Sequence, residues 1–369
     1  TALAVLESCI LKATGETLDL SEENMKNIIA MYSDYGWKMN TNEGGYNNMP
    51  WGYLAGWLGP VDETDNQFDD KSTLSPILNS TIHVQNIKFL KRSSFTDNDE
   101  IKRAVLNYGA VGTGMYFSGY YLNTRNFAYY YMGTGGNHAV TIVGWDDTYS
   151  KYNFRSTPSG DGAWIVRNSW DSSWGNDGYF YVSYYDTCFA APNVEASAYT
   201  FILNDTIRFD RNYQYDIAGM TDYFYKATSN ALYKNRFTST CDEYLAAVST
   251  YFEKATNWTA TVLVNDEIKD ELSGISASGY YTFNLNKFIP VKSGDVFEVI
   301  FNITTSGDVG VPISEIYSLN KLVYAPGVSY ISWDGVNWFD LYNFSKTYPD
   351  HTYNSGVACI KAFTYLNPI

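Results

Sequence analysis

Helical periodicity is confined to the first 109 residues of this 369-residue chain. Apolar side chains recur at helical spacing from Leu3 onward, Ser21 is a good N-cap, and Gly15 and Gly109 are natural C-terminal stops. These features predict helices over residues 1–15, 21–31 and 96–109. From Ala110 the pattern changes to short segments rich in Val, Ile, Trp and Tyr, which are typical of strands.

The length of the chain and the loss of any helical pattern in its second half predict two domains. Residues 1–188 are expected to form an α+β domain, with a helical part followed by an antiparallel β part at residues 110–117, 138–145, 163–168 and 179–184. Residues 189–204 are expected to be a junction. Residues 205–369 show no helical period and predict an all-β sandwich. Its expected strands are residues 243–252, 259–264, 279–283, 295–303, 321–324, 329–333 and 357–363.

Charge and cysteine content exclude several classes of function. The net charge of -15 would repel nucleic acid and anionic membrane surfaces. No run approaches the roughly 18 apolar residues of a membrane span. Four scattered cysteines are too few for a disulfide framework or a CxxC metal site, although Cys241 and Cys359 could pair. We therefore expect no nucleic-acid partner, no membrane span in this segment, no metal and no cofactor.

One group of residues carries recognisable chemistry. His138 opens an expected strand, and Asn168-Ser169-Trp170 follows at the end of the next one. A thiol nucleophile needs a base near neutral pH, and an imidazole supplies it. An amide oxygen can hold that imidazole in one tautomer and orientation. A histidine at a strand start is by itself usually structural, and we assign no site role to His83 or His351.

In this order the motifs resemble the papain-type cysteine peptidases, the C1 family, over residues 1–187. The resemblance implies a Cys-His-Asn mechanism in which His138 is the base and Asn168 orients it. Trp170 would shield their hydrogen bond from water, and Trp174 would line the leaving-group side of the cleft. Protein or peptide is the implied substrate. The substrate-binding residues that the resemblance implies are Gly44, Gly45 and Asn137.

The chain departs from the family at the nucleophile. Alignment of Glu7 and Gly15 with the family's first helix places the catalytic cysteine a few residues before Thr1. Cys9 lies about 18 Å further along that helix, on an apolar face, and is expected to be a buried structural thiol. This chain alone is therefore expected to be inactive, with the thiol supplied by an upstream segment or another chain. A milder departure is Asp171, which replaces a glycine.

Residues 205–369 resemble the lectin-like β-domain that follows papain-type peptidases in some prokaryotic cell-surface proteins. The resemblance is carried by residues 212–216, 332–338 and 359–363. It implies a glycan or cell-surface ligand, because exposed Trp and Tyr rings can stack on sugar faces. Trp333 and Trp338 are equally well explained as hairpin packing, so no sugar-binding residue is named.

These features favour an extracellular or cell-surface cysteine endopeptidase with a C-terminal binding domain. The alternative is a non-catalytic papain-like adhesion or carbohydrate-binding protein. The residue at the nucleophile position separates the two hypotheses. A cysteine there supports the enzyme, whereas Ser, Ala or Gly supports the alternative.

Overall fold

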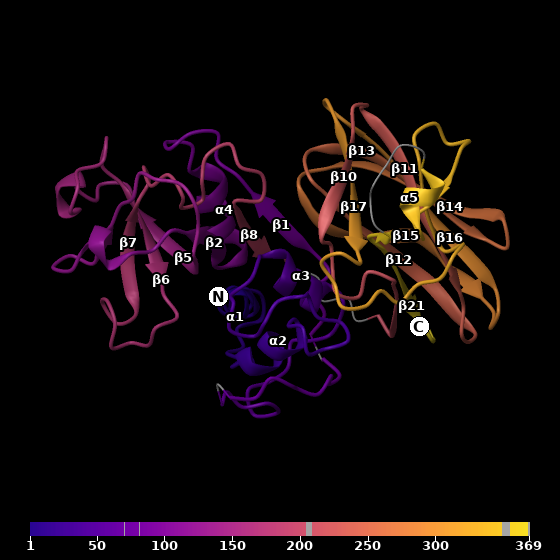
Figure 1. Ribbon diagram of the computed structural model, residues 1–369, viewed down its shortest axis with the longest axis horizontal. Coiled ribbons are helices and arrows are strands. Elements are labelled where there is room, and N and C mark those ends of the chain that lie inside the picture. Colours follow the sequence, from indigo (N-terminus) through magenta and orange to yellow (C-terminus); the bar gives the residue numbers. More distant parts are fainter. Residues whose placement is uncertain (70, 81, 204–208, 349–354, 368–369) are drawn as a thin grey trace. The chain divides into compact units, whose positions relative to one another are not determined.

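The computed structural model describes residues 1–69, 71–80, 82–203, 209–348 and 355–367 (Figure 1). His351 and the expected domain start at residues 205–208 lie outside the described residues. The chain divides into two compact units. The first unit comprises Thr1–Asp19 and Ile87–Asp205, and the second comprises Leu20–Asn86 and Thr206–Ile369. The domain boundaries expected from the sequence stay a prediction, because this division follows compactness rather than chain order.

The first unit combines a largely antiparallel sheet with two helices. Its strand order is β3-β4-β7-β6-β5-β2-β8-β1, and β4 and β7 run parallel. Its helices are α1 (Ala2–Thr14) and α4 (Asp99–Tyr108). Its strands are β1 (Ile87–Leu90), β2 (Val111–Met115), β3 (Leu122–Asn123), β4 (Ala128–Tyr129), β5 (His138–Asp146), β6 (Ala163–Arg167), β7 (Tyr179–Ser183) and β8 (Ala198–Phe201).

Helix α1 forms where the periodicity predicts it. Leu3, Leu6 and Ile10 are buried on one face, and the helix packs against α4, β2 and β8. Gly15 ends the helix in the left-handed conformation, with φ 78°, and its N–H donates to the carbonyl of Leu11 at 2.9 Å. Strand β8 lies inside the expected junction, so residues 189–204 contribute a strand to the sheet rather than only a linker.

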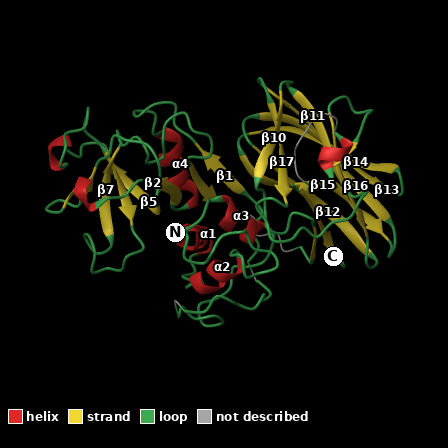
Figure 2. Cartoon of the chain, in the orientation of Figure 1, coloured by secondary structure: helices red, strands yellow, loops and turns green. Residues whose placement is uncertain are grey.

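The second unit contains the segment Leu20–Asn86 and the C-terminal residues. The segment contributes α2 (Glu22–Ile28) and α3 (Asn48–Ala55), whereas the C-terminal part consists mainly of strands joined by loops (Figure 2). Its sheets have the orders β15-β12-β21-β9, β10-β17-β20 and β14-β13-β16-β11-β18-β19.

The C-terminal elements begin after residue 208. The strands are β9 (Arg211–Tyr213), β10 (Asp222–Lys226), β11 (Asn230–Thr238), β12 (Glu243–Phe252), β13 (Thr256–Val264), β14 (Glu267–Ser276), β15 (Gly279–Val291), β16 (Val296–Thr305), β17 (Val309–Glu315), β18 (Ser329–Ser332), β19 (Phe339–Asp340), β20 (Gly356–Ala358) and β21 (Ile360–Tyr365), with the short helix α5 (Phe344–Thr347).

Side chains from all three sheets share one hydrophobic core, which confirms the predicted all-β sandwich. Strand β13 shows the pattern clearly, because Trp258, Ala260 and Val262 are buried while Thr259 and Thr261 between them are half-buried. In the described residues, no helix is long and apolar enough to cross a membrane.

Several elements differ from the prediction. The expected strand at residues 321–324 is wrong, because that stretch is irregular. The neighbouring Leu319 is fully buried and pairs with Trp37 instead of joining a sheet. Helix α3 was not predicted because Pro50 and Gly52 interrupt its pattern. The other strands that were not predicted are β1, β3, β4, β9, β10, β11, β14, β17 and β19.

Candidate active site

The position of His138 is set by backbone pairing. His138 is the first residue of β5 and lies opposite Met115, the last residue of β2. Asn137 holds the backbone at the start of β5, because its N–H donates to the carbonyl of Met115 at 3.0 Å. Its side-chain oxygen accepts from the N–H of Phe117 at 2.7 Å, and its NH2 group donates to the carbonyl of Phe117 at 3.0 Å. The side chain of Asn137 therefore holds the backbone beside His138.

His138 and Asn168 meet across neighbouring strands. Asn168 directly follows β6, which pairs with β5, and its side chain is buried. His138 Nε2 lies 2.8 Å from Asn168 Oδ1. The sequence predicted this pair, and the structure brings the two side chains into hydrogen-bond contact.

The backbone N–H of Ser169 fixes the direction of that hydrogen bond. It donates to the same oxygen, Asn168 Oδ1, at 2.9 Å, so the amide must present its oxygen here. An amide oxygen only accepts hydrogen bonds, so His138 Nε2 must carry the proton. In the neutral imidazole, Nδ1 is then the basic nitrogen.

Burial lowers the pKa of His138, and the hydrogen bond to Asn168 partly offsets this by favouring the charged ring. The ring is half-buried. A histidine poised between neutral and charged forms can accept a proton and later return it. The pair can therefore serve as a general base and then a general acid.

Aromatic rings surround the pair. Trp170 stacks on His138, with ring centroids 4.8 Å apart and planes at 26°, although its side chain is still 41% exposed. Phe117 packs edge-on against Trp170 at 4.8 Å, and Trp174 packs edge-on against Trp170 at 5.1 Å. Sequence reasoning missed Phe117, because no local pattern indicates a contact between the end of β2 and Trp170.

Asp171 adopts the conformation that a glycine would favour. Its φ is 69°, in the left-handed region that Asp and Asn tolerate best among side-chain-bearing residues. Its carboxylate accepts hydrogen bonds from the backbone N–H of Ser172 and, at 3.4 Å, from that of Ser173. The hydroxyl of Ser172 donates to the same carboxylate at 3.0 Å, and this bond, followed by the two backbone bonds, lowers the pKa of Asp171. Asp171 thus takes up the backbone conformation of a glycine and stabilises it with local hydrogen bonds.

All four cysteines are free thiols. Cys9 is buried in α1, and its Sγ lies 3.4 Å from the hydroxyl of Thr200. Burial raises the pKa of the Cys9 thiol, which makes thiolate formation less favourable. The Sγ of Cys188 donates to the carbonyl of Gly133 at 3.4 Å. Cys9 is therefore a structural thiol, as predicted.

The start of α1 lies beside His138. The hydroxyl of Thr1 donates to the carbonyl of Ala139, the residue that follows His138, at 2.8 Å. The N-terminal end of a helix carries a partial positive charge that favours anions such as a thiolate.

Gly44 and Gly45 belong to the second compact unit. They lie in an exposed loop before α3, and Gly44 has a φ of 78°. A side chain at Gly45 would meet the sulfur of Met49 at 2.8 Å. The positive φ explains the glycine at position 44, and the role of both residues in substrate binding stays a prediction.

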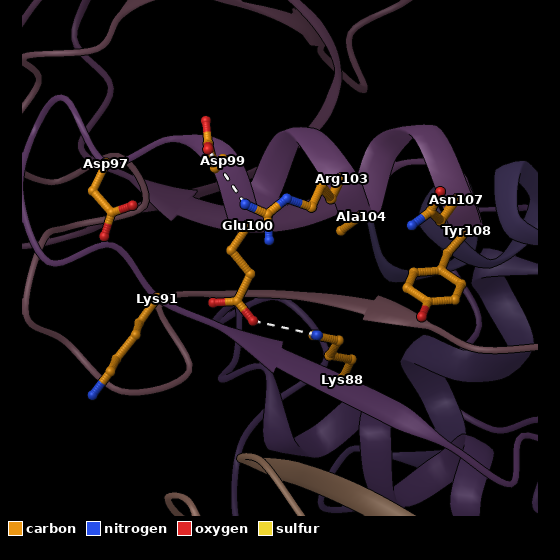
Figure 3. A pocket seen from close by; sticks show the side chains of 9 residues that line it. All are labelled: Lys88, Lys91, Asp97, Asp99, Glu100, Arg103, Ala104, Asn107 and Tyr108. Atoms are coloured by element: carbon orange, nitrogen blue, oxygen red, sulfur yellow. Dashed lines mark hydrogen bonds and ion pairs between the residues drawn. The ribbon is translucent and has the colours of Figure 1, made fainter.

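A charged groove elsewhere in the first unit lies between α4 and β1 (Figure 3). Glu100 pairs with Lys88 at 3.3 Å, and Asp99 pairs with Arg103 at 3.3 Å. Opposite charges neutralise one another here, which favours a solvated surface over a binding site. In the part of the chain that the structure describes, no group of three or more His, Cys, Asp and Glu side chains could hold a metal ion.

Comparison with protein families supports the reading of both domains. A profile described as "Papain family cysteine protease" matches residues 1–202, and one described as "Lectin like domain" matches residues 212–364. The chain is 27% identical over 183 residues to cathepsin K of Mus musculus, covering 47% of this chain and 49% of that protein. It is 26% identical over 189 residues to a cysteine protease of Blomia tropicalis, covering 49% and 52%. The chain thus spans about half the length of these curated relatives.

Solved structures agree in fold over nearly the whole chain. The cysteine protease and lectin-like domains of Cwp84, a surface layer associated protein of Clostridium difficile, match with a TM-score of 0.79 at 24% identity, covering 99% of this chain and 83% of that one. Cwp84 after propeptide cleavage matches with a TM-score of 0.81 at 23% identity, covering 100% and 93%. This chain therefore belongs to the papain family of cysteine proteases, and its papain-like domain is followed by a lectin-like all-β domain.

Proposed function

We propose that this chain is the body of a cysteine endopeptidase in which His138 is the general base and acid and Asn168 its orienting partner. The observation that carries the proposal is the hydrogen bond of 2.8 Å between His138 Nε2 and Asn168 Oδ1. Its direction, fixed by Ser169, leaves Nδ1 to take the proton of a thiol. The thiolate would attack the peptide carbonyl, and His138 would protonate the leaving amine. Water would then hydrolyse the thioester.

The surrounding residues have supporting roles in this proposal. Trp170 would exclude water from one face of the His138 ring, and Trp174 would line the leaving-group side. Asn137 would contribute backbone to the substrate side while its side chain holds Phe117. Gly44 and Gly45 would pair with the substrate backbone through main-chain groups.

The thiol would come from a residue that precedes Thr1 in the parent protein, or from another chain. Support comes from the contact between Thr1 and Ala139, because it places the start of α1 next to His138. Cys9 is an unsuitable source, since its sulfur is buried and contacts Thr200. We propose an extracellular or cell-surface location. The Cwp84 likeness is consistent with it, because that protein is described as surface layer associated.

Labelling of the natural protein with an epoxide inhibitor of papain-type enzymes tests the proposal. We expect one label, on a cysteine just before Thr1. His138→Ala should abolish labelling by removing the base, whereas Cys9→Ala should leave it unchanged. Labelling that survives His138→Ala, or a Ser, Ala or Gly at the nucleophile position, would contradict the peptidase and favour the non-catalytic adhesion protein.

We also propose that the lectin-like domain binds a neutral glycan on the outer face of the six-stranded sheet. The strand register places Ser273, Thr259 and Asn302 in one row, and Asn257 and Thr304 in the next row. These side chains line a shallow depression beside Ile275, whose side chain is 77% exposed. Uncharged amides and hydroxyls next to an apolar surface suit the hydroxyl groups and apolar faces of a sugar.

A glycan array probed with the full chain tests this second proposal. Binding of neutral glycans should weaken in the variant Asn302→Ala. Thr238→Ala is the matched control, because it lies on the same face of the sheet away from the depression. A flat array, or equal binding by both variants, would contradict the proposed site.

A further inference from the structure

The segment Leu20–Asn86 packs backbone to backbone against the C-terminal domain, within the second compact unit. A Cβ atom placed on Gly52 of α3 would lie 2.1 Å from the carbonyl oxygen of Ala218. One placed on Gly219 would lie 2.3 Å from the Cα of Gly52. Gly56 makes a similar approach, 2.2 Å from the carbonyl oxygen of Ile217. Only glycine fits at such contacts, so the glycines allow these two stretches of backbone to come into direct contact.

Main-chain hydrogen bonds join the same parts at a second place. The N–H of Lys38 donates to the carbonyl of Ser318 at 2.9 Å, and the N–H of Asn320 donates to the carbonyl of Gly36 at 3.0 Å. The side chain of Asn320 donates to the carbonyls of Met31 and Ser33 at 2.6 Å and 2.9 Å. These bonds resemble the pairing of two strands, although the segments are far apart in the chain.

A small core closes this contact. Trp37, Met49, Ala218 and Leu319 are all buried in one cluster. The indole N–H of Trp37 donates to the carbonyl of Ala218 at 3.2 Å. Part of the hydrophobic cluster around Trp37 therefore comes from the C-terminal domain.

A third contact lies at the other end of the segment. The side-chain hydroxyl of Thr282 in β15 donates to the carbonyl of Gln85 at 2.7 Å, and its N–H donates to the side chain of Asn86 at 3.0 Å. Trp57 stacks on Phe363 of β21 with ring centroids 5.5 Å apart. The segment is thus attached at three separate places.

The segment has little structure of its own with which to form a core. Its described residues form two helices, of seven and eight residues, and no named strand. Helices this short are unstable in water without tertiary packing. A stretch of this size is only marginally stable even when it has regular elements to pack.

We propose that the lectin-like domain is the folding scaffold of Leu20–Asn86, the segment that carries Gly44 and Gly45. The domain is then a structural part of the peptidase rather than a detachable binding module. The inference depends on packing inside the second unit and holds whether or not the chain is catalytic.

Hydrogen exchange of the full chain, measured by mass spectrometry, tests the scaffold. Gly219→Ala places a Cβ against Gly52, whereas Gly307→Ala is a matched control in open space. Both glycines have positive φ, 90° and 81°, so both variants carry the same kind of backbone strain. We expect Gly219→Ala to speed exchange in α2 and α3 by about tenfold or more, with β13 and β16 unchanged. Gly307→Ala should leave α2 and α3 at the wild-type rate.

The proposal is overturned if folded Gly219→Ala leaves α3 unchanged, or if Gly307→Ala loosens α3 equally. Should Gly219→Ala fail to fold, Asn320→Ala decides the question. It removes two hydrogen bonds to the segment and should speed exchange at residues 31–37. Asn286→Ala is its control, because the hydrogen bonds of that amide go to Asp270 and Glu271 within the β-domain. Equal exchange at residues 31–37 in these two variants would also overturn the proposal.

Discussion

The position of the proton on His138 depends on two hydrogen bonds that share one acceptor, Asn168 Oδ1. Asn168 Oδ1 accepts both from the imidazole and from the N–H of Ser169, so the amide cannot rotate without losing the second bond. A buried polar network of this kind holds one geometry more firmly than a single bond would. The backbone N–H of Ser169 therefore determines that the proton of the neutral His138 ring lies on Nε2.

Asn168→Ala should lower the pKa of His138 further. The hydrogen bond to Asn168 raises that pKa against the effect of burial, so its loss leaves burial unopposed. NMR titration of the His138 ring protons in the full chain measures the change. Asn126→Ala, in a loop outside the site, should leave the pKa unchanged. A higher pKa in Asn168→Ala would mean that the bond favours the neutral ring.

Sequence and structure agree best for residues whose chemistry is carried by a local motif. His138, Asn168 and Trp170 stand in motifs with fixed neighbours, and all three meet in space. Phe117 and the N–H of Ser169 could not be assigned from the sequence. Every residue except proline has a backbone N–H, so the residue type at 169 does not reveal this donor, and the place of Phe117 follows from the pairing of β2 with β5.

The loop after β7 is a separate element that supports the approach to His138. Asp186 accepts the N–H groups of Cys188 and Phe189 on one oxygen and that of Tyr131 on the other, all at 2.9 Å. The fully buried Arg92 donates to three backbone carbonyls of the same loop and its start, including that of Phe189 at 3.0 Å. The bond from Tyr131 to Asp186 holds this loop against the irregular segment between β4 and β5 that leads to His138.

The ionisation of Asp186 makes the contribution of this loop to stability depend on pH. Burial raises the pKa of Asp186 to about 6, although the three N–H donors and Arg92 oppose the shift. A carboxyl whose pKa is raised in the folded state contributes stability that is complete below its unfolded pKa of about 4. That contribution is lost as the pH rises through about 6.

Asp186→Asn should remove this dependence. Relative to the variant, the wild-type protein should lose on the order of 2–3 kcal/mol of unfolding free energy between pH 4 and pH 7. Urea unfolding of both proteins at several pH values measures the difference. Asp171→Asn is a suitable control, because Asp171 is exposed and should show no such loss. A difference that stays constant with pH would show that Asp186 remains ionised throughout.

At the scale of the whole molecule, the order of the motifs predicts the folds of both domains. It does not predict which segments of the chain belong to which compact unit. A papain-like part followed by a lectin-like part could be predicted because each carries its own motifs. The attachment of Leu20–Asn86 to the C-terminal domain could not, because it rests on contacts such as that of Gly52 with Gly219. Glycines in two distant stretches of sequence do not reveal that they touch.

The division of the chain also determines where it can be recombined with a relative. A chimera that exchanges only residues after 205 would keep Gly52 and Gly56 but offer them a foreign backbone at 217–219. Such a chimera would need a C-terminal domain whose glycine and backbone carbonyl groups lie in the same positions as those of residues 217–219. Crossovers near residues 19, 86 and 205 would keep each compact unit intact, so inheritance of a new lectin-like domain would carry part of the papain-like sequence with it.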